Sequence, residues 1–135
     1  MPVTLEIVSP ERLLLSRPVD MAVIPAYEGD LAAMPNHAPM IVMLRGGVVA
    51  LHEGDRVTDR FFVTSGFAEI TADRCTVLAD EAVSLADLTR ADAEKRVAEA
   101  EAGYDSVDKL DIAAREAAMD RLLAARAMLQ AASAA

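Results

Sequence analysis

The sequence contains a single cysteine, no tryptophan and only five other aromatic residues. One thiol cannot form an internal disulfide, so the chain fits a reducing compartment, and the apolar neighbours of Cys75 indicate a small buried side chain. So few aromatic residues also leave no surface on which nucleic-acid bases would stack. With 135 residues, the chain is long enough to bury a core without covalent crosslinks.

Positive charge is also scarce. Thirteen basic residues face 22 acidic ones, which gives a net charge of −9 and opposes binding to nucleic acid or to anionic lipid. No run approaches the ~18 consecutive apolar residues of a spanning helix, and the N-terminal segment lacks the pattern of a signal peptide. We therefore expect a soluble, untargeted protein without direct membrane insertion.

The chain has few groups for catalysis. Its only histidines, His37 and His52, are separated by apolar residues, and it contains no nucleophile elbow, zinc-ligand spacing or glycine-rich phosphate loop. We expect no catalytic or metal-binding residues. One alternative remains open, a small enzyme or ligand-binding domain that uses His37 with a carboxylate such as Asp30. Because Pro35 and Pro39 frame His37, this residue is either a turn histidine or a partner contact on a pre-ordered loop.

Composition changes near residue 85. All six prolines, five of six glycines and 10 alanines precede this point, whereas 17 alanines, one glycine and no proline occupy the last 50 residues. We therefore expect two regions, residues 1–85 and 86–135.

The first region has the pattern of short strands. β-rich runs separated by proline, glycine or aspartate fall at 3–8, 12–16, 19–24, 40–44, 47–53, 60–66, 67–72 and 75–83. This spacing predicts an antiparallel β-sandwich or barrel. Residues 53–56 predict a hairpin, since Gly54 adopts positive φ at no steric cost.

The second region predicts two helices. Thr89 caps the first helix, which Gly103 ends, and Asp105 or Ser106 caps a second helix over 107–131. The short connection favours an antiparallel hairpin with one thin apolar stripe, so the hairpin needs support from the sandwich or from another protein. The predicted stripe consists of Ile112, Met119, Leu122, Arg126 and Leu129.

Three segments followed by an alanine-rich hairpin resemble the epsilon subunit of bacterial F-type ATP synthases. They are "LEIVSPE" at 5–11, "EGDLAAMPNHAPMIVMLRGG" at 28–47 and "FFVTSGFAEITADRCTVLADEA" at 61–82. The resemblance implies a ten-stranded β-sandwich followed by two helices, acting as a non-catalytic rotor subunit in the central stalk. It also implies that the sandwich binds the gamma subunit and rests on the ring of c subunits, at the cytoplasmic face of the inner (plasma) membrane.

By position, the resemblance makes Glu28, Asp30 and His37 candidates for contact with the ring, from two loops at the same end of the sandwich. It places Met40 and its neighbours on the face toward gamma. The sequence departs from the family pattern at Ala32, where a second glycine is usual.

Some members of the family bind ATP through an Asp-x-x-Arg-Ala segment and a further arginine. Here Asp87 and Arg90 match that segment, but Val97 stands where the further arginine is expected, and Arg96 is rotated by about 100° around the helix. We expect no cofactor, and ATP binding remains the less favoured alternative.

In relatives that inhibit ATP hydrolysis, the last helix extends into the alpha–beta hexamer with basic side chains against an acidic segment. In this chain the basic residues after Val107 are balanced by acidic ones, so we expect weak inhibition or none. The basic residues are Lys109, Arg115, Arg121 and Arg126, and the acidic ones are Asp108, Asp111, Glu116 and Asp120.

Overall fold

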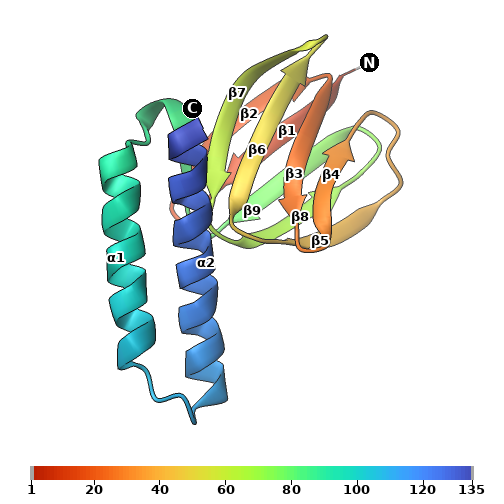
Figure 1. The fold of residues 1–135 in the computed structure, drawn as a ribbon. Helices are drawn as coiled ribbons and strands as arrows, with labels where there is room; N and C mark the ends of the chain where they lie inside the picture. The colour runs from red at the N-terminus through yellow and green to blue at the C-terminus, as the bar shows by residue number, and fades with distance from the viewer. Residues whose placement is uncertain (1, 135) are drawn as a thin grey trace.

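A computed structural model describes residues 2–134 as a sheet of ten strands followed by two helices (Figure 1). The predicted fold class, an antiparallel β-sandwich before a helical hairpin, is confirmed. The strands are β1 (Val3–Val8), β2 (Leu13–Val19), β3 (Met21–Ala26), β4 (Gly29–Ala33), β5 (Met40–Leu44), β6 (Gly47–Glu53), β7 (Arg56–Val63), β8 (Gly66–Ile70), β9 (Arg74–Ala79) and β10 (Ala82–Ser84).

The sheet folds over on itself into two layers, with β3, β4, β6 and β7 in front of β1, β2, β8 and β9 in Figure 1. Its hydrogen-bonded order is β10-β7-β6-β3-β5-β8-β9-β1-β2, and β4 pairs with β3 alone. Every described pairing is antiparallel except that of β1 with β9. The sheet therefore ends in three edges, at β2, β4 and β10.

The core lies between the two layers. Val3, Leu5 and Ile7 alternate with more exposed residues along β1 and are fully buried, as the sequence predicts for one face of a strand. Cys75 joins the same cluster, and burial raises the pKa of its thiol to about 11. This thiol is therefore protonated and unreactive at neutral pH.

The structure corrects two strand predictions. Residues 29–33 form β4 and not part of a loop. The sequence does not predict this strand, because glycine and alanine are poor indicators of a strand. The predicted strand 75–83 is two strands, β9 and β10, separated at Asp80 and Glu81. The hairpin at 53–56 is confirmed, with Gly54 at φ +61°.

The helices differ from prediction at the hairpin's turn. A 3₁₀ turn, η1 (Leu85–Asp87), precedes α1 (Arg90–Ser106), and the Thr89 hydroxyl accepts a hydrogen bond from the amide of Asp92 as predicted. Gly103 does not end α1: the helix continues to Ser106. Beyond its end, Lys109 Nζ donates to the carbonyls of Tyr104 and Val107.

The second helix, α2 (Ile112–Ala134), also begins later than predicted. Asp111 caps it instead of Asp105 or Ser106, because its carboxylate accepts from the Ala114 amide at 3.1 Å. Neither helix in the part of the chain that the structure describes combines the length and the hydrophobicity of a membrane span.

The hairpin packs against the sandwich through small residues. A second core cluster contains Phe62 of β7, Ala93 of α1 and Met128 of α2, and all three side chains are buried. The predicted stripe is partly wrong, since Ile112 and Arg126 are exposed. The buried residues of α2 are mainly alanines, namely Ala118, Leu122, Ala124, Ala125 and Met128.

Gly46 explains why alanines occupy this contact. A Cβ on Gly46 would lie 2.8 Å from the Cα of Ala124, so the β5–β6 connection touches the backbone of α2. Only small side chains permit this approach of helix to sheet.

The division at residue 85 remains a prediction, and truncation tests it. The main core cluster contains no residue beyond Ala79, apart from a packing contribution by Ala82. A chain that ends at residue 86 should therefore fold and unfold cooperatively. Exposure of Phe62 should lower its free energy of unfolding by roughly 1.5–3 kcal/mol. Thermal unfolding followed by circular dichroism measures both the cooperativity and the free energy of unfolding. Loss of a cooperative transition contradicts the proposed boundary.

Candidate functional surfaces

The structure places Asp30 and His37 at opposite ends of β4. Asp30 is the second residue of β4 and pairs with Arg45 at 2.7 Å, whereas His37 follows the strand and its Nδ1 donates to the Ala38 carbonyl at 2.7 Å. Five extended residues at about 3.3 Å each separate the two ends. Asp30 and His37 have separate partners and do not form a close acid–base pair, so the structure does not support the alternative of an enzyme that uses them together.

Metal binding has no geometry to support it either. Among residues 2–134, no group of three His, Cys, Asp or Glu side chains is positioned to hold a metal ion.

The acidic turn lies between β3 and β4. Tyr27 and Glu28 form the two-residue turn, and Gly29 follows with φ +135°, a conformation that side chains disfavour. The ion pair of Asp30 with Arg45 ties this turn to the β5–β6 connection, which touches α2. The acidic turn therefore lies at the end of the sandwich that meets the hairpin.

The loop around His37 lies at the other end. Asn36, at φ +67°, donates its amide to the Ala72 carbonyl at 2.6 Å, which holds the loop beside the β8–β9 turn. The expectation that the acidic loop and the proline-framed loop share one end is therefore wrong, because β4 runs between them.

Met40 begins β5 opposite Ile70 of β8, and its side chain is partly exposed. Further along β5, Val42 and Leu44 pack into or against the core, while Ile41 and Met43 are exposed on the outer face. Both faces of β5 are thus apolar, although only one is covered in this chain. The uninterrupted sequence "MIVML" carried that signal, since a strand with one solvated face normally alternates.

Met43 belongs to a row of apolar residues across five strands. Strand register places Met43 beside Phe67, Phe67 beside Leu78, Leu78 beside Val8 and Val8 beside Leu13. Met43, Phe67 and Leu13 are 61%, 40% and 55% exposed. We call these five residues the outer apolar row. Only the β5 end of this row can be identified from the sequence, because cross-strand neighbours depend on strand register.

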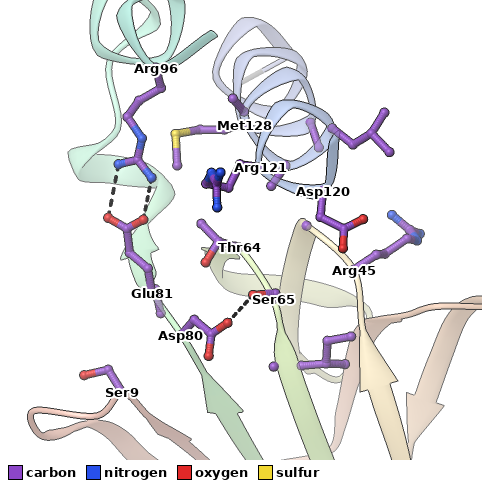
Figure 2. A pocket seen from close by; sticks show the side chains of 18 of the residues that line it. Ser9, Arg45, Thr64, Ser65, Asp80, Glu81, Arg96, Asp120, Arg121 and Met128 are labelled. Carbon is purple, nitrogen blue, oxygen red and sulfur yellow. Dashed lines mark hydrogen bonds and ion pairs between the residues drawn. The ribbon is translucent and has the colours of Figure 1, made fainter. Parts of the chain in front are cut away.

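A cleft of about 1550 Å³ lies between the outer row and the hairpin. Figure 2 shows Arg96 reaching from α1 to Glu81, while Asp120, Arg121 and Met128 of α2 form the opposite wall. The guanidinium of Arg96 holds both Glu81 oxygens, at 2.5 and 3.1 Å. These hydrogen bonds from Arg96 lower the pKa of Glu81 below its ordinary value.

The charges around the Asp-x-x-Arg-Ala segment do not suit the binding of a nucleoside triphosphate. Arg90 pairs with Glu94 at 2.9 Å, and Arg96 is engaged by Glu81. The adjacent cavity of about 360 Å³ has two cationic side chains against four carboxylates, so phosphate groups would be repelled. The charged residues that line it are Lys95, Arg96, Glu81, Asp87, Asp92 and Glu99.

Comparison with known proteins identifies the class of protein to which the fold belongs. Residues 2–85 match the family described as the ATP synthase delta/epsilon chain, β-sandwich domain. Two solved assemblies share the fold: a Euglena gracilis mitochondrial ATP synthase (TM-score 0.78, 21% identity, 96% of this chain and 81% of the other) and a Tetrahymena thermophila mitochondrial ATP synthase central stalk and c ring (TM-score 0.66, 16% identity, 98% and 97%).

Bacterial relatives define the family more closely. The ATP synthase epsilon chain of Granulibacter bethesdensis is 60% identical over 129 residues, covering 96% of each chain. That of Gluconacetobacter diazotrophicus is 54% identical over 132 residues, covering 98% of this chain and 94% of its own. The chain belongs to the ATP synthase epsilon chain family, which confirms the sequence resemblance.

The Arg96–Glu81 pair predicts a pH dependence of hairpin docking. Because the pKa of folded Glu81 lies below its ordinary value of 4.5, the stabilisation is fully present above pH 4.5. It is lost as the pH falls through the lowered pKa. The difference in Tm between the native chain and Glu81→Gln should therefore shrink as the pH falls from about 7 to about 3. If this difference in Tm does not change with pH, the Arg96–Glu81 pair does not stabilise the docked hairpin.

Glu94→Gln is the matched control for this experiment. It removes an ion pair that lies within α1, with Arg90 one turn away, and that does not reach the sandwich. It should alter the Tm less than Glu81→Gln at neutral pH.

Proposed function

We propose that the chain is a non-catalytic rotor subunit of the central stalk of a proton-translocating ATP synthase. In this role it couples rotation of the c ring and the gamma subunit to ATP synthesis and hydrolysis. The observation that carries the assignment to a binding subunit is the outer apolar row, which presents apolar side chains in register across five strands. Membership of the epsilon chain family names the complex to which those side chains belong.

The outer apolar row is proposed as the gamma-binding face. Four steps between strands, each about 4.8 Å, give the row a width of about 19 Å, which suits the centre of a protein interface. Phe67 lies between Met43 and Leu78 and is the one aromatic side chain of the row, and aromatic residues are enriched at protein interfaces. Ile41, exposed beside Glu69 on the same outer face, widens this surface toward Met40.

Glu28 and Asp30 are proposed to contact the c ring from the acidic turn. Both side chains are exposed, and within residues 2–134 Glu28 has no ion-pair partner. His37 lies at the other end of β4. It is proposed to contact the ring separately, from its proline-framed loop. The hairpin is proposed to face the alpha–beta hexamer, and the subunit to lie peripherally at the cytoplasmic face of the membrane.

Phe67→Asp tests the gamma-binding face. A carboxylate buried within an apolar interface should raise the Kd for gamma by about thirtyfold or more. Leu110→Asp is the matched control, since Leu110 is 90% exposed at the turn of the hairpin and lies outside the row. Isothermal titration with purified gamma measures both variants. Equal effects, or none, would refute the assignment of the row.

Asp30→Asn and Arg45→Gln separate a ring contact from an internal ion pair. If Asp30 only held Arg45, both variants would have the same small effect, because this pair is exposed. We expect Asp30→Asn to reduce ATP-driven proton pumping in reassembled membranes more than Arg45→Gln does. Identical pumping by the two variants would make Asp30 a structural residue.

A further inference from the structure

The three edges of the sheet are protected unequally. β2 contains Pro18, which has no amide hydrogen to offer, and an irregular register with β1 near Val8. β10 has three residues and continues at once into η1, where Val83 and Leu85 pack with the helices. These two edges cannot easily accept another strand.

β4 has none of these protections. It is a five-residue strand without proline or irregular register, and it pairs only with β3. In an antiparallel hairpin closed by a two-residue turn, alternate residues bond across the pair. Gly29, Leu31 and Ala33 therefore bond to β3, while the amides and carbonyls of Asp30 and Ala32 point away from it. Among the backbone hydrogen bonds that residues 2–134 make outside the regular strand ladders, none is donated by the amide of Asp30 or of Ala32.

The side chains along β4 leave this edge accessible. Leu31 packs against the core and Ala33 is buried, so neither covers the outer backbone groups. Gly29 and Ala32 are too small to shield them. Exposed apolar side chains flank the strand at both ends, with Tyr27 60% and Met34 51% exposed.

We propose that β4 is completed by strand addition from an extended, basic segment of a neighbouring subunit of the complex. The proposal rests on the proposed ring contact at Glu28 and Asp30 and states how that contact is made. Main-chain hydrogen bonds from the added segment satisfy Asp30 and Ala32, in the mode known as β-augmentation. The added segment is basic because Glu28 and Asp30 lie at one end of the edge and the chain carries a net charge of −9.

Amide hydrogen exchange in the assembled enzyme tests the proposal. The full-length chain, labelled with ¹⁵N, is reassembled with ATP synthase lacking this subunit, exposed to D₂O, quenched, released and read by NMR. The amides of Asp30 and Ala32 should exchange at least about a hundredfold more slowly in the complex than in the free chain. The amide of Leu31, already bonded to β3, should change far less and serves as the internal control.

Unchanged exchange at Asp30 and Ala32 overturns the inference. If Asp30→Asn still impairs pumping in that case, the ring contact is made by side chains alone and the proposed function stands. If neither effect is found, both fail. Protection that appears in the free chain as its concentration rises would identify a second copy of this chain as the occupant, and would also overturn the proposal.

Ala32→Pro supplies an independent measurement. Proline removes the outward amide hydrogen of residue 32 and leaves the bonds of Leu31 and Ala33 to β3 in place. It should weaken binding to the complex about tenfold, while Ala32→Ser, which keeps the amide, should bind within about twofold of the native chain. Equal binding by the two variants counts against strand addition. If Ala32→Pro does not fold by circular dichroism, the exchange measurement decides.

Discussion

The relation between the two halves of the molecule depends on the burial of Phe62. Its ring leaves β7 on the side opposite the main core and is enclosed by Ala93 and Met128. Partly buried apolar residues of the sheet, of η1 and of α2 pack around this cluster, while the buried residues of α2 are mainly alanines. Gly46 lets α2 approach closely enough to close over the ring, and the Arg96–Glu81 pair fixes the rotation of α1 from outside. The cluster around Phe62, the close approach at Gly46 and the Arg96–Glu81 pair together determine where the hairpin lies.

This arrangement leaves the outer face of β5, β8 and β9 uncovered. Had the hairpin carried larger side chains, it would have needed more of the sheet to pack against, and the outer apolar row would have been part of an internal core. Instead the hairpin lies to one side and a cleft separates α2 from the row. The narrow contact between sandwich and hairpin and the uncovered apolar face thus both follow from the small side chains of the hairpin.

The sequence was sufficient for the strands that carry a clear apolar run or a clear alternation. β1, β5 and β6 fall where the apolar pattern places them, and the hairpin at Gly54 follows from its need for positive φ. β4 could not be predicted because Gly29, Ala32 and Ala33 carry little strand preference, and only pairing with β3 defines it. The prediction that Gly103 ends α1 is wrong. A glycine can end a helix, but here the helix continues to Ser106, and Lys109 donates to the carbonyls of Tyr104 and Val107.

The candidate residues show the same division. Exposure of Glu28, Asp30 and Met40 could be anticipated from their segments, but their spatial grouping could not. Whether His37 lies near Asp30 depends on β4 being extended. Whether Met43 and Leu13 belong to one row depends on the register of three intervening strands. Long-range register is a tertiary property that a local pattern does not contain.

The parallel pairing of β1 with β9 has a consequence for synthesis of the chain. Glu6 and its neighbour Thr76 are 70 residues apart in sequence, and β1 is made first. At about 5–20 residues per second, a ribosome takes roughly 4–14 s to deliver the partner of β1. During that interval the nascent hairpin of β1 and β2 has its buried face, Val3, Leu5 and Ile7, open to other chains. Pairing with β9 then places β1 between two strands, β2 and β9, so the N-terminal strand of the finished sandwich is held by hydrogen bonds from both sides.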